Sequence, residues 1–68
     1  MDQTIIYEIR VEGRLSDFWS AWFGGLDIKG GPGRETLLRG KLSDQAALFG
    51  ILNKIQALNL TLISVKRK

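Results

Sequence analysis

Few side chains in this sequence could do chemistry. Two serines, Ser16 and Ser43, each precede an aspartate, but a serine nucleophile needs a base to activate it. The 68 residues include no histidine and no cysteine, which removes the commonest general base and the usual transition-metal ligands. The seven carboxylates show no spacing typical of an acid and base pair. We therefore expect no enzymatic activity, no metal and no cofactor, and interpret both serines as helix caps.

The glycine-rich segment Gly30-Gly31-Pro32-Gly33-Arg34 resembles a phosphate-binding loop only in its composition. A phosphate-binding loop leads into a helix and usually carries Gly-Lys-Ser/Thr, whereas this segment leads into a strand-like run. Glycine and proline in this pattern are typical of tight turns. The segment is therefore predicted to be the tip of a hairpin.

Four large aromatic side chains fall within about two helical turns, at Phe18, Trp19, Trp22 and Phe23. Rings of this size usually anchor a hydrophobic core, because each can bury about 150–250 Å². The alternative is that one pair, Phe18 with Trp22, protrudes and docks onto a partner or onto a second copy. Both interpretations remain open from the sequence.

Charge is unevenly distributed along the chain, whose net charge is +3. Residues 1–33 carry three basic and five acidic groups, net −2, and residues 34–68 carry seven basic and two acidic groups, net +5. This asymmetry raises nucleic-acid binding as a hypothesis. Sheets that bind RNA expose aromatic rings on their central strands, and Tyr7 has the wrong alternation for that, so we do not favour it. The candidate contacts would be Arg34, Arg39, Lys41, Lys66, Arg67 and Lys68.

A weak internal repeat organises the chain. The segment 13–17, Gly-Arg-Leu-Ser-Asp, recurs as Gly-Lys-Leu-Ser-Asp at 40–44. Each copy follows a strand-like run, predicted at 4–12 and 35–41 from the alternation of apolar and polar residues. Each copy then opens a helix, because a serine followed by an aspartate suits a helix N-terminus.

The helix after the first copy is predicted to be short, from Asp17 to Phe23. The second is predicted from about Asp44 to Leu58, where the apolar residues fall on one stripe, with Asn59 in the left-handed conformation near its end. Further strands are predicted at 26–29 and 60–65.

This order predicts one α+β domain over residues 1–68, with a ferredoxin-like βαββαβ fold. Such a fold has a four-stranded antiparallel sheet in the order 4-1-3-2, with one short and one long helix on one face. A ββαβ arrangement without the first helix is the alternative. The basic tail 66–68 could remain disordered.

The stretches 7–26 and 38–52, followed by Ser64-Val65, carry the motifs W-x-x-W-F-G-G and D-Q-A-A-L-x-G. With these motifs the chain resembles a group of small, uncharacterised, stand-alone prokaryotic proteins of about this length. The resemblance implies a complete protein and no assigned chemistry. Members of that group often have histidine where this chain has Phe49, so a polar role at that position is not carried over.

The open face of the predicted sheet carries a candidate interface. Ile6, Leu37 and Leu62 would be near neighbours across three strands, ringed by charge, and such a patch suggests an interface. A chain of this size also forms only a small core, which association with a second copy would extend. We expect a homodimer packed through the sheets or paired through an edge strand. The interface candidates are Ile6, Leu37, Leu62, Phe18 and Trp22.

The most favoured function is therefore that of a small non-catalytic homodimeric protein-interaction domain. The alternatives are a nucleic-acid-binding protein and an ACT-like dimer that senses a small ligand near Gly24-Gly25. No apolar run is long enough to cross a membrane, and the start of the sequence lacks the pattern of a signal peptide. With no cysteine there is no sign of an oxidising compartment, so a cytoplasmic location without membrane contact is the expectation.

Overall fold

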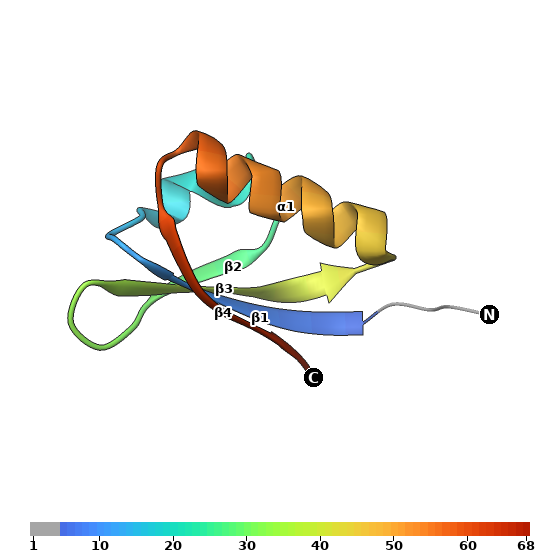
Figure 1. Cartoon of the computed structure of the whole chain (residues 1–68), viewed down its shortest axis with the longest axis horizontal. Helices are drawn as coiled ribbons and strands as arrows, with labels where there is room; N and C mark the ends of the chain where they lie inside the picture. The colour runs from blue at the N-terminus through green and yellow to red at the C-terminus, as the bar shows by residue number, and fades with distance from the viewer. Residues whose placement is uncertain (1–4) are drawn as a thin grey trace.

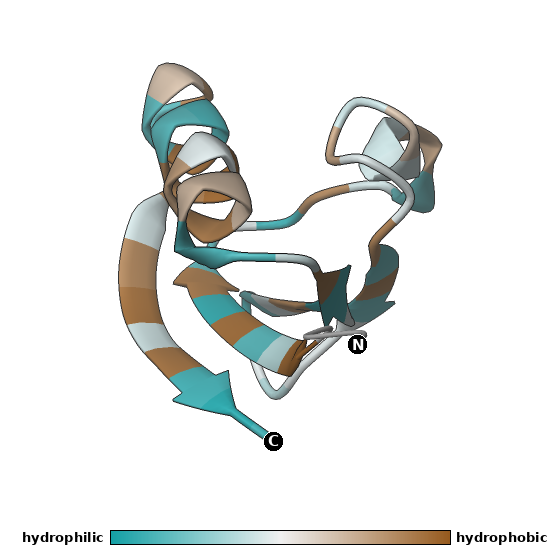
Figure 2. Cartoon of the chain, turned by 90° about the vertical axis from the view of Figure 1, so that its right-hand side faces the viewer, coloured by the Kyte–Doolittle hydropathy of each residue, from teal (hydrophilic) through white to brown (hydrophobic). Residues whose placement is uncertain are grey.

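The computed structural model describes residues 5–68 as an α+β fold built on one four-stranded antiparallel sheet. The single α-helix and a short 3-10 helix lie on the same face of this sheet (Figures 1 and 2). The strands have the order β2-β3-β1-β4. In chain order the elements are β1 (Ile5–Glu12), η1 (Asp17–Ser20), β2 (Asp27–Gly30), β3 (Glu35–Leu42), α1 (Gln45–Ala57) and β4 (Thr61–Arg67).

β1 lies inside the sheet and pairs with β3 on one side and β4 on the other. The predicted alternation of buried and exposed residues in β1 is confirmed. Ile9 and Val11 are fully buried under the helices, while Arg10 and Glu12 are exposed on the open face. Thr4, the predicted first residue of this strand, lies outside the described residues. The strand therefore divides the sheet into an apolar inner face and a charged open face.

The predicted hairpin tip is confirmed between β2 and β3. The Gly31 backbone N–H donates to the Glu35 carbonyl at 2.8 Å, and the Glu35 N–H donates to the Pro32 carbonyl at 3.1 Å. Gly33 has φ +63°, a conformation that glycine adopts without steric cost. The segment is therefore a tight turn that reverses the chain direction between β2 and β3, and it does not lead into a helix as a phosphate-binding loop does.

The long helix is found within one residue of its predicted ends, but its N-cap differs. The carboxylate of Asp44 accepts a hydrogen bond from the Ala47 N–H at 2.8 Å, so Asp44 and not Ser43 caps α1. Aspartate is the more favourable N-cap here because its charge also complements the positive end of the helix dipole. At the other end Asn59 has φ +58°, as predicted. Ile51 and Ile55 are the buried residues of the helix.

The predicted first helix is wrong in type and extent. Instead of a helix from Asp17 to Phe23, the structure has the single 3-10 turn η1, followed by irregular turns as far as Gly24. The Phe23 N–H donates to the carbonyls of both Trp19 and Ser20, which is a mixed pattern. A segment of two turns ended by Gly24-Gly25 is too short to stabilise a regular α-helix, and 3-10 geometry is common in such pieces. Ser16 still caps it, since its hydroxyl accepts from the Phe18 N–H at 3.2 Å.

Thr36 ties the segment between β1 and η1 to the sheet. It is the one buried polar side chain among the described residues, with 1% of its surface exposed. Its hydroxyl donates to the Gly13 carbonyl at 2.6 Å and accepts from the Leu15 N–H at 3.2 Å. These two hydrogen bonds therefore hold the beginning of the irregular segment, at Gly13 and Leu15, against β3.

β4 runs farther than predicted, as far as Arg67, and so includes most of the basic tail. The Lys68 N–H also donates to the Ile6 carbonyl at 2.7 Å. Lys66 and Arg67 of the basic tail thus belong to this edge strand.

Candidate functional site

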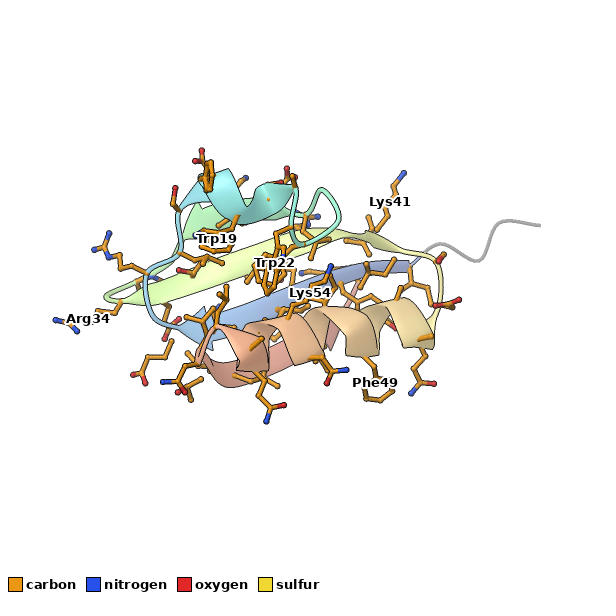
Figure 3. The ribbon with its side chains drawn as sticks, turned by 90° about the horizontal axis from the view of Figure 1, so that it is seen from above. Trp19, Trp22, Arg34, Lys41, Phe49 and Lys54 are labelled. Atoms are coloured by element: carbon orange, nitrogen blue, oxygen red, sulfur yellow. The ribbon has the colours of Figure 1, made fainter. Side chains whose placement is uncertain are left out.

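The largest gathering of exposed apolar side chains lies along β4 and the adjacent side of α1. β4 is an edge strand, with β1 on one side, and its brown bands in Figure 2 run along the sheet edge below the helix. Phe49 is 54% exposed, and Figure 3 shows it on the side of α1 that faces away from η1. We call these residues the β4–α1 strip: Phe49, Leu52, Leu62, Ile63 and Val65.

A groove of about 260 Å³ runs between α1 and β4 within this strip. Leu52 and Leu62 form apolar walls on opposite sides, and the amides of Asn53 and Gln56 stand at its rim. An apolar groove with a polar rim is typical of a surface that another protein covers.

A β-bulge decides which side of the sheet each residue of β4 faces. Arg10 pairs with Ser64 but Val11 pairs with Leu62, so Ile63 is an extra residue without a partner on β1. Because a one-residue shift reverses the alternation, Leu62 lies with Val11 on the helix side. The prediction that Leu62 joins Ile6 and Leu37 on the open face is therefore wrong.

The open face retains a second candidate site. A hollow of about 280 Å³ lies over β1, β2 and β3, with Ile6 and Leu37 in its lining. We call it the open-face hollow. Cross-strand register places Lys29 beside Leu37, and Lys41 beside Ile6. Two further charged residues, Arg39 and Asp27, line the hollow and face each other across β3 and β2.

The six basic residues proposed for nucleic-acid contact do not form one patch. Arg34 stands at the hairpin tip and Lys41 at the opposite end of the molecule (Figure 3). Arg39 and Lys68 share the carboxylate of Glu8 on the open face, at 3.7 and 3.5 Å. Lys66 lies opposite Glu8 in the register, and Arg67 opposite Tyr7. Four of the six therefore lie on the open face and are partly paired there, whereas Arg34 and Arg67 lie apart from them.

The four aromatic residues divide between core and surface. Phe23 is fully buried and Trp19 packs against the core, whereas Phe18 is 82% exposed and Trp22 is partly exposed. Successive rings meet edge to face, with centroids 5.6 Å apart for Trp19 and Trp22 and 5.0 Å for Trp22 and Phe23. Of the predicted protruding pair, Phe18 projects freely and Trp22 is engaged by the helix.

Lys54 of α1 holds Trp22 across the inner face (Figure 3). Its Nζ donates to the Trp22 carbonyl at 2.7 Å and lies 5.6 Å from the centroid of the ring. One side chain thus makes a charge-assisted hydrogen bond and a cation–π contact. This contact connects the irregular segment after η1 to the only long helix among residues 5–68.

We expect Lys54→Met to lower the free energy of unfolding by about 1 kcal/mol, because the apolar stem remains while the hydrogen bond and cation–π contact are lost. Urea unfolding followed by tryptophan fluorescence measures the change. Lys29→Met removes the same charge from the open face and should change stability by less than about 0.5 kcal/mol. If the two substitutions lowered the free energy of unfolding equally, the loss of net charge, and not the contact with Trp22, would explain the effect of Lys54→Met.

The glycine pair proposed as a ligand site, Gly24-Gly25, ends the irregular segment. Both residues have positive φ, +73° and +86°, and a Cβ built on either would meet nothing within 4 Å. The pair serves the chain reversal and lines neither the groove nor the hollow. Across residues 5–68 no group of three or more metal-ligating side chains is found. No helix in that range has the length and hydropathy needed to cross a bilayer.

Sequence reasoning missed Phe49, Ile63 and Val65 as surface residues. A signal existed for β4, because four of the six residues from Leu60 to Val65 are apolar. Such a run fits burial on both faces and fits an exposed apolar edge equally well. Phe49 lies off the apolar stripe of the helix, and its large ring was the only indication of an exposed anchor.

One protein-family model matches this chain. Residues 6–66 match a domain of unknown function, DUF8691, and this match spans nearly all of the sequence. The chain belongs to this family. Comparisons with curated proteins and with solved structures found no match to the DUF8691 chain.

Proposed function

We propose that this DUF8691 protein is a non-catalytic interaction domain that acts as a homodimer, formed through the β4–α1 strip. The observation that carries the proposal is the apolar edge of β4 beside the groove of α1. An uncovered edge strand offers a row of backbone donors and acceptors to another strand. Between Thr61 and Val65 this edge has no charge and no proline to prevent such pairing.

The strand is self-complementary in the antiparallel direction. With Val65 opposite Leu62 of the second copy, both pairs of apolar side chains meet on the helix side of a continuous sheet. The same register sets Lys66 opposite Thr61, whose neighbour on β1 is Glu12. Glu12 lies on the same face one strand beyond Thr61, so this register brings a carboxylate toward each Lys66, whereas a parallel in-register pairing would align Lys66 and Arg67 with their own copies. Charge therefore favours a two-fold axis across β4.

Such a dimer also covers the groove. The two α1 helices lie over their own β4 strands, so joining the strands brings both helices to the junction. Phe49 and Leu52 would then face the second copy, and the rim amides of Asn53 and Gln56 would lie at the periphery. Apolar residues at the centre with polar residues around them is the usual organisation of a stable interface.

We also infer that the fold is a reduced ferredoxin-like arrangement. The strand order read from the β4 edge is 4-1-3-2, and the connection through α1 joins β3 to β4 across β1. The first connection, which would hold the other helix in that fold, holds only η1. This shorter connection leaves the β2 side thinly covered and makes α1 the main helix available to a dimer.

The test compares two substitutions that add the same charge to exposed apolar positions. Val65→Lys lies in the strip, and we expect it to raise the dimer dissociation constant at least about tenfold, since a charge would enter an apolar contact. Phe18→Lys lies on η1, away from the strip, and should leave the constant unchanged. Sedimentation over a range of concentrations measures both.

Two results would contradict the proposal. If Val65→Lys associates like the unchanged protein, β4 is not the interface. If Phe18→Lys alone dissociates the dimer, the interface is the protruding aromatic surface of Phe18 and Trp22. Both positions are exposed, so we expect each variant to keep the fold. Amide spectra of each variant check this.

A further inference from the structure

We propose that the open-face hollow binds a compact organic dianion, such as a phosphate monoester or a dicarboxylate, with its apolar part resting on Ile6 and Leu37. The hollow has a volume of about 280 Å³ and lies over β1, β2 and β3. That size is just below the usual range for small-molecule sites, which suits a small ligand of about ten non-hydrogen atoms. This proposal does not depend on the dimer, whose strip lies at the β4 edge.

The charges around the hollow favour a dianion. Lys29, Arg39 and Lys41 contribute three positive charges, and Asp27 contributes one negative charge. Among residues 5–68, neither Lys29 nor Lys41 forms a salt bridge, whereas Arg39 contacts Glu8 at 3.7 Å. Glu8 is itself neutralised from the other side by Lys68 at 3.5 Å. The lining thus keeps a positive excess that one dianion would balance.

The arrangement of these groups distinguishes the hollow from an ordinary charged surface. The register surrounds Leu37 with Lys29 on β2 and Arg39 on the same strand, while Ile6 lies beside Lys41. Cations therefore stand around an apolar floor. Lysine and arginine side chains can both bond oxyanions, and arginine presents a planar fork that suits phosphate and carboxylate groups. An anion without an apolar part would use only half of these contacts.

The same features speak against a nucleic acid. A sheet that binds RNA exposes aromatic rings for stacking, and the sheet's one aromatic residue, Tyr7, lies on the helix side and packs against the core. The floor here is formed by two aliphatic side chains, which offer no stacking surface. A compact ligand with one apolar group matches the hollow better than a long polyanion does.

The test is a titration of the full chain with phenyl phosphate, followed by the amide signals of Ile6, Leu37 and Gly40. We expect saturable shifts with a dissociation constant of about 1 mM or below. Phthalate tests the dicarboxylate source, inorganic phosphate lacks the apolar part, and phenol lacks the charge. Inorganic phosphate and phenol should each bind at least about tenfold more weakly than phenyl phosphate, because each uses half of the contacts.

Variants locate the site. Lys41→Gln should weaken phenyl phosphate binding by about fivefold to tenfold, while Arg34→Gln, at the distant hairpin tip, should leave it unchanged. Leu37→Ala should weaken phenyl phosphate more than inorganic phosphate. Shifts that fail to saturate, or equal losses in Lys41→Gln and Arg34→Gln, would overturn the proposal. So would much tighter binding of a single-stranded oligonucleotide with shifts that spread to Lys66, which would assign the face to nucleic acid instead.

Discussion

Phe23→Ala is expected to lower the free energy of unfolding by about 3–5 kcal/mol. Phe23 is fully buried, and it is the innermost ring of the aromatic series that crosses the inner face. A domain of this size has a total stability of roughly 3–10 kcal/mol, so the loss is a large part of the whole. The segment from Gly13 to Leu26 has no regular α-helix to support it, and Phe23 is its largest fully buried side chain.

The comparison that isolates this effect is Phe18→Ala. Phe18 has the same side chain, lies on η1 close by in sequence, and is 82% exposed. Its removal should change the free energy of unfolding by less than about 0.5 kcal/mol. Urea unfolding at low protein concentration separates this stability from any contribution of association. A loss below about 1 kcal/mol for Phe23→Ala would contradict the assignment of Phe23 as the anchor of this segment.

Thr36→Val is expected to destabilise the fold by about 1–3 kcal/mol, although it keeps the shape of the side chain. The hydroxyl of Thr36 bonds the Gly13 carbonyl at 2.6 Å and the Leu15 N–H at 3.2 Å. Both groups would lose their partner beneath the start of the irregular segment. We further expect faster amide exchange at Leu15, because its N–H would have no acceptor in the protein.

Thr36→Ser is the matched variant for this prediction. Serine keeps the hydroxyl and loses one methyl group, so the exchange protection of Leu15 should remain close to that of the unchanged protein. If valine and serine have the same effect on Leu15, then burial of the methyl group, and not the hydrogen bonds, holds this segment. Thermal unfolding of the two variants, monitored alongside exchange, gives the corresponding stabilities.

Much of the fold follows from local patterns in the sequence. The alternation in β1 identified its buried side, and Ile9 and Val11 are fully buried as a result. The apolar stripe of α1 and the left-handed Asn59 were predictable because each depends on residues close together in the chain. The hairpin after β2 was predictable for the same reason, since glycine and proline determine such a turn locally.

The features that could not be predicted depend on pairing between distant segments. The bulge at Ile63 leaves no trace in a strand that is apolar on both sides, yet it moves Leu62 to the opposite face. Whether the first helix is an α-helix or a 3-10 turn depends on how much support the packing of Phe23 gives to a short segment that ends in glycines. In the structure only the 3-10 turn η1 forms. The sequence therefore predicted Ile6 and Leu37 on the open face, and pairing through an edge strand, but not the position of Leu62 on the helix side.

The two surfaces have different chemistry and lie on different parts of the sheet. The β4–α1 strip is apolar and belongs to the β4 edge, whereas the open-face hollow is cationic and lies over β1, β2 and β3. A dimer joined through β4 would therefore leave one hollow accessible on each copy. The proposed association and the proposed binding of a dianion therefore use separate surfaces and would not compete.

If two copies of this chain associate through the β4–α1 strip, the absolute mass in solution shows it. Light scattering on a sizing column, over a wide range of loading concentrations, gives that mass without a shape assumption. We predict a mass that approaches twice the 7.6 kDa of one chain as the concentration rises. A mass of one chain at every loading would contradict the proposed dimer and leave the apolar edge of β4 without the partner proposed for it.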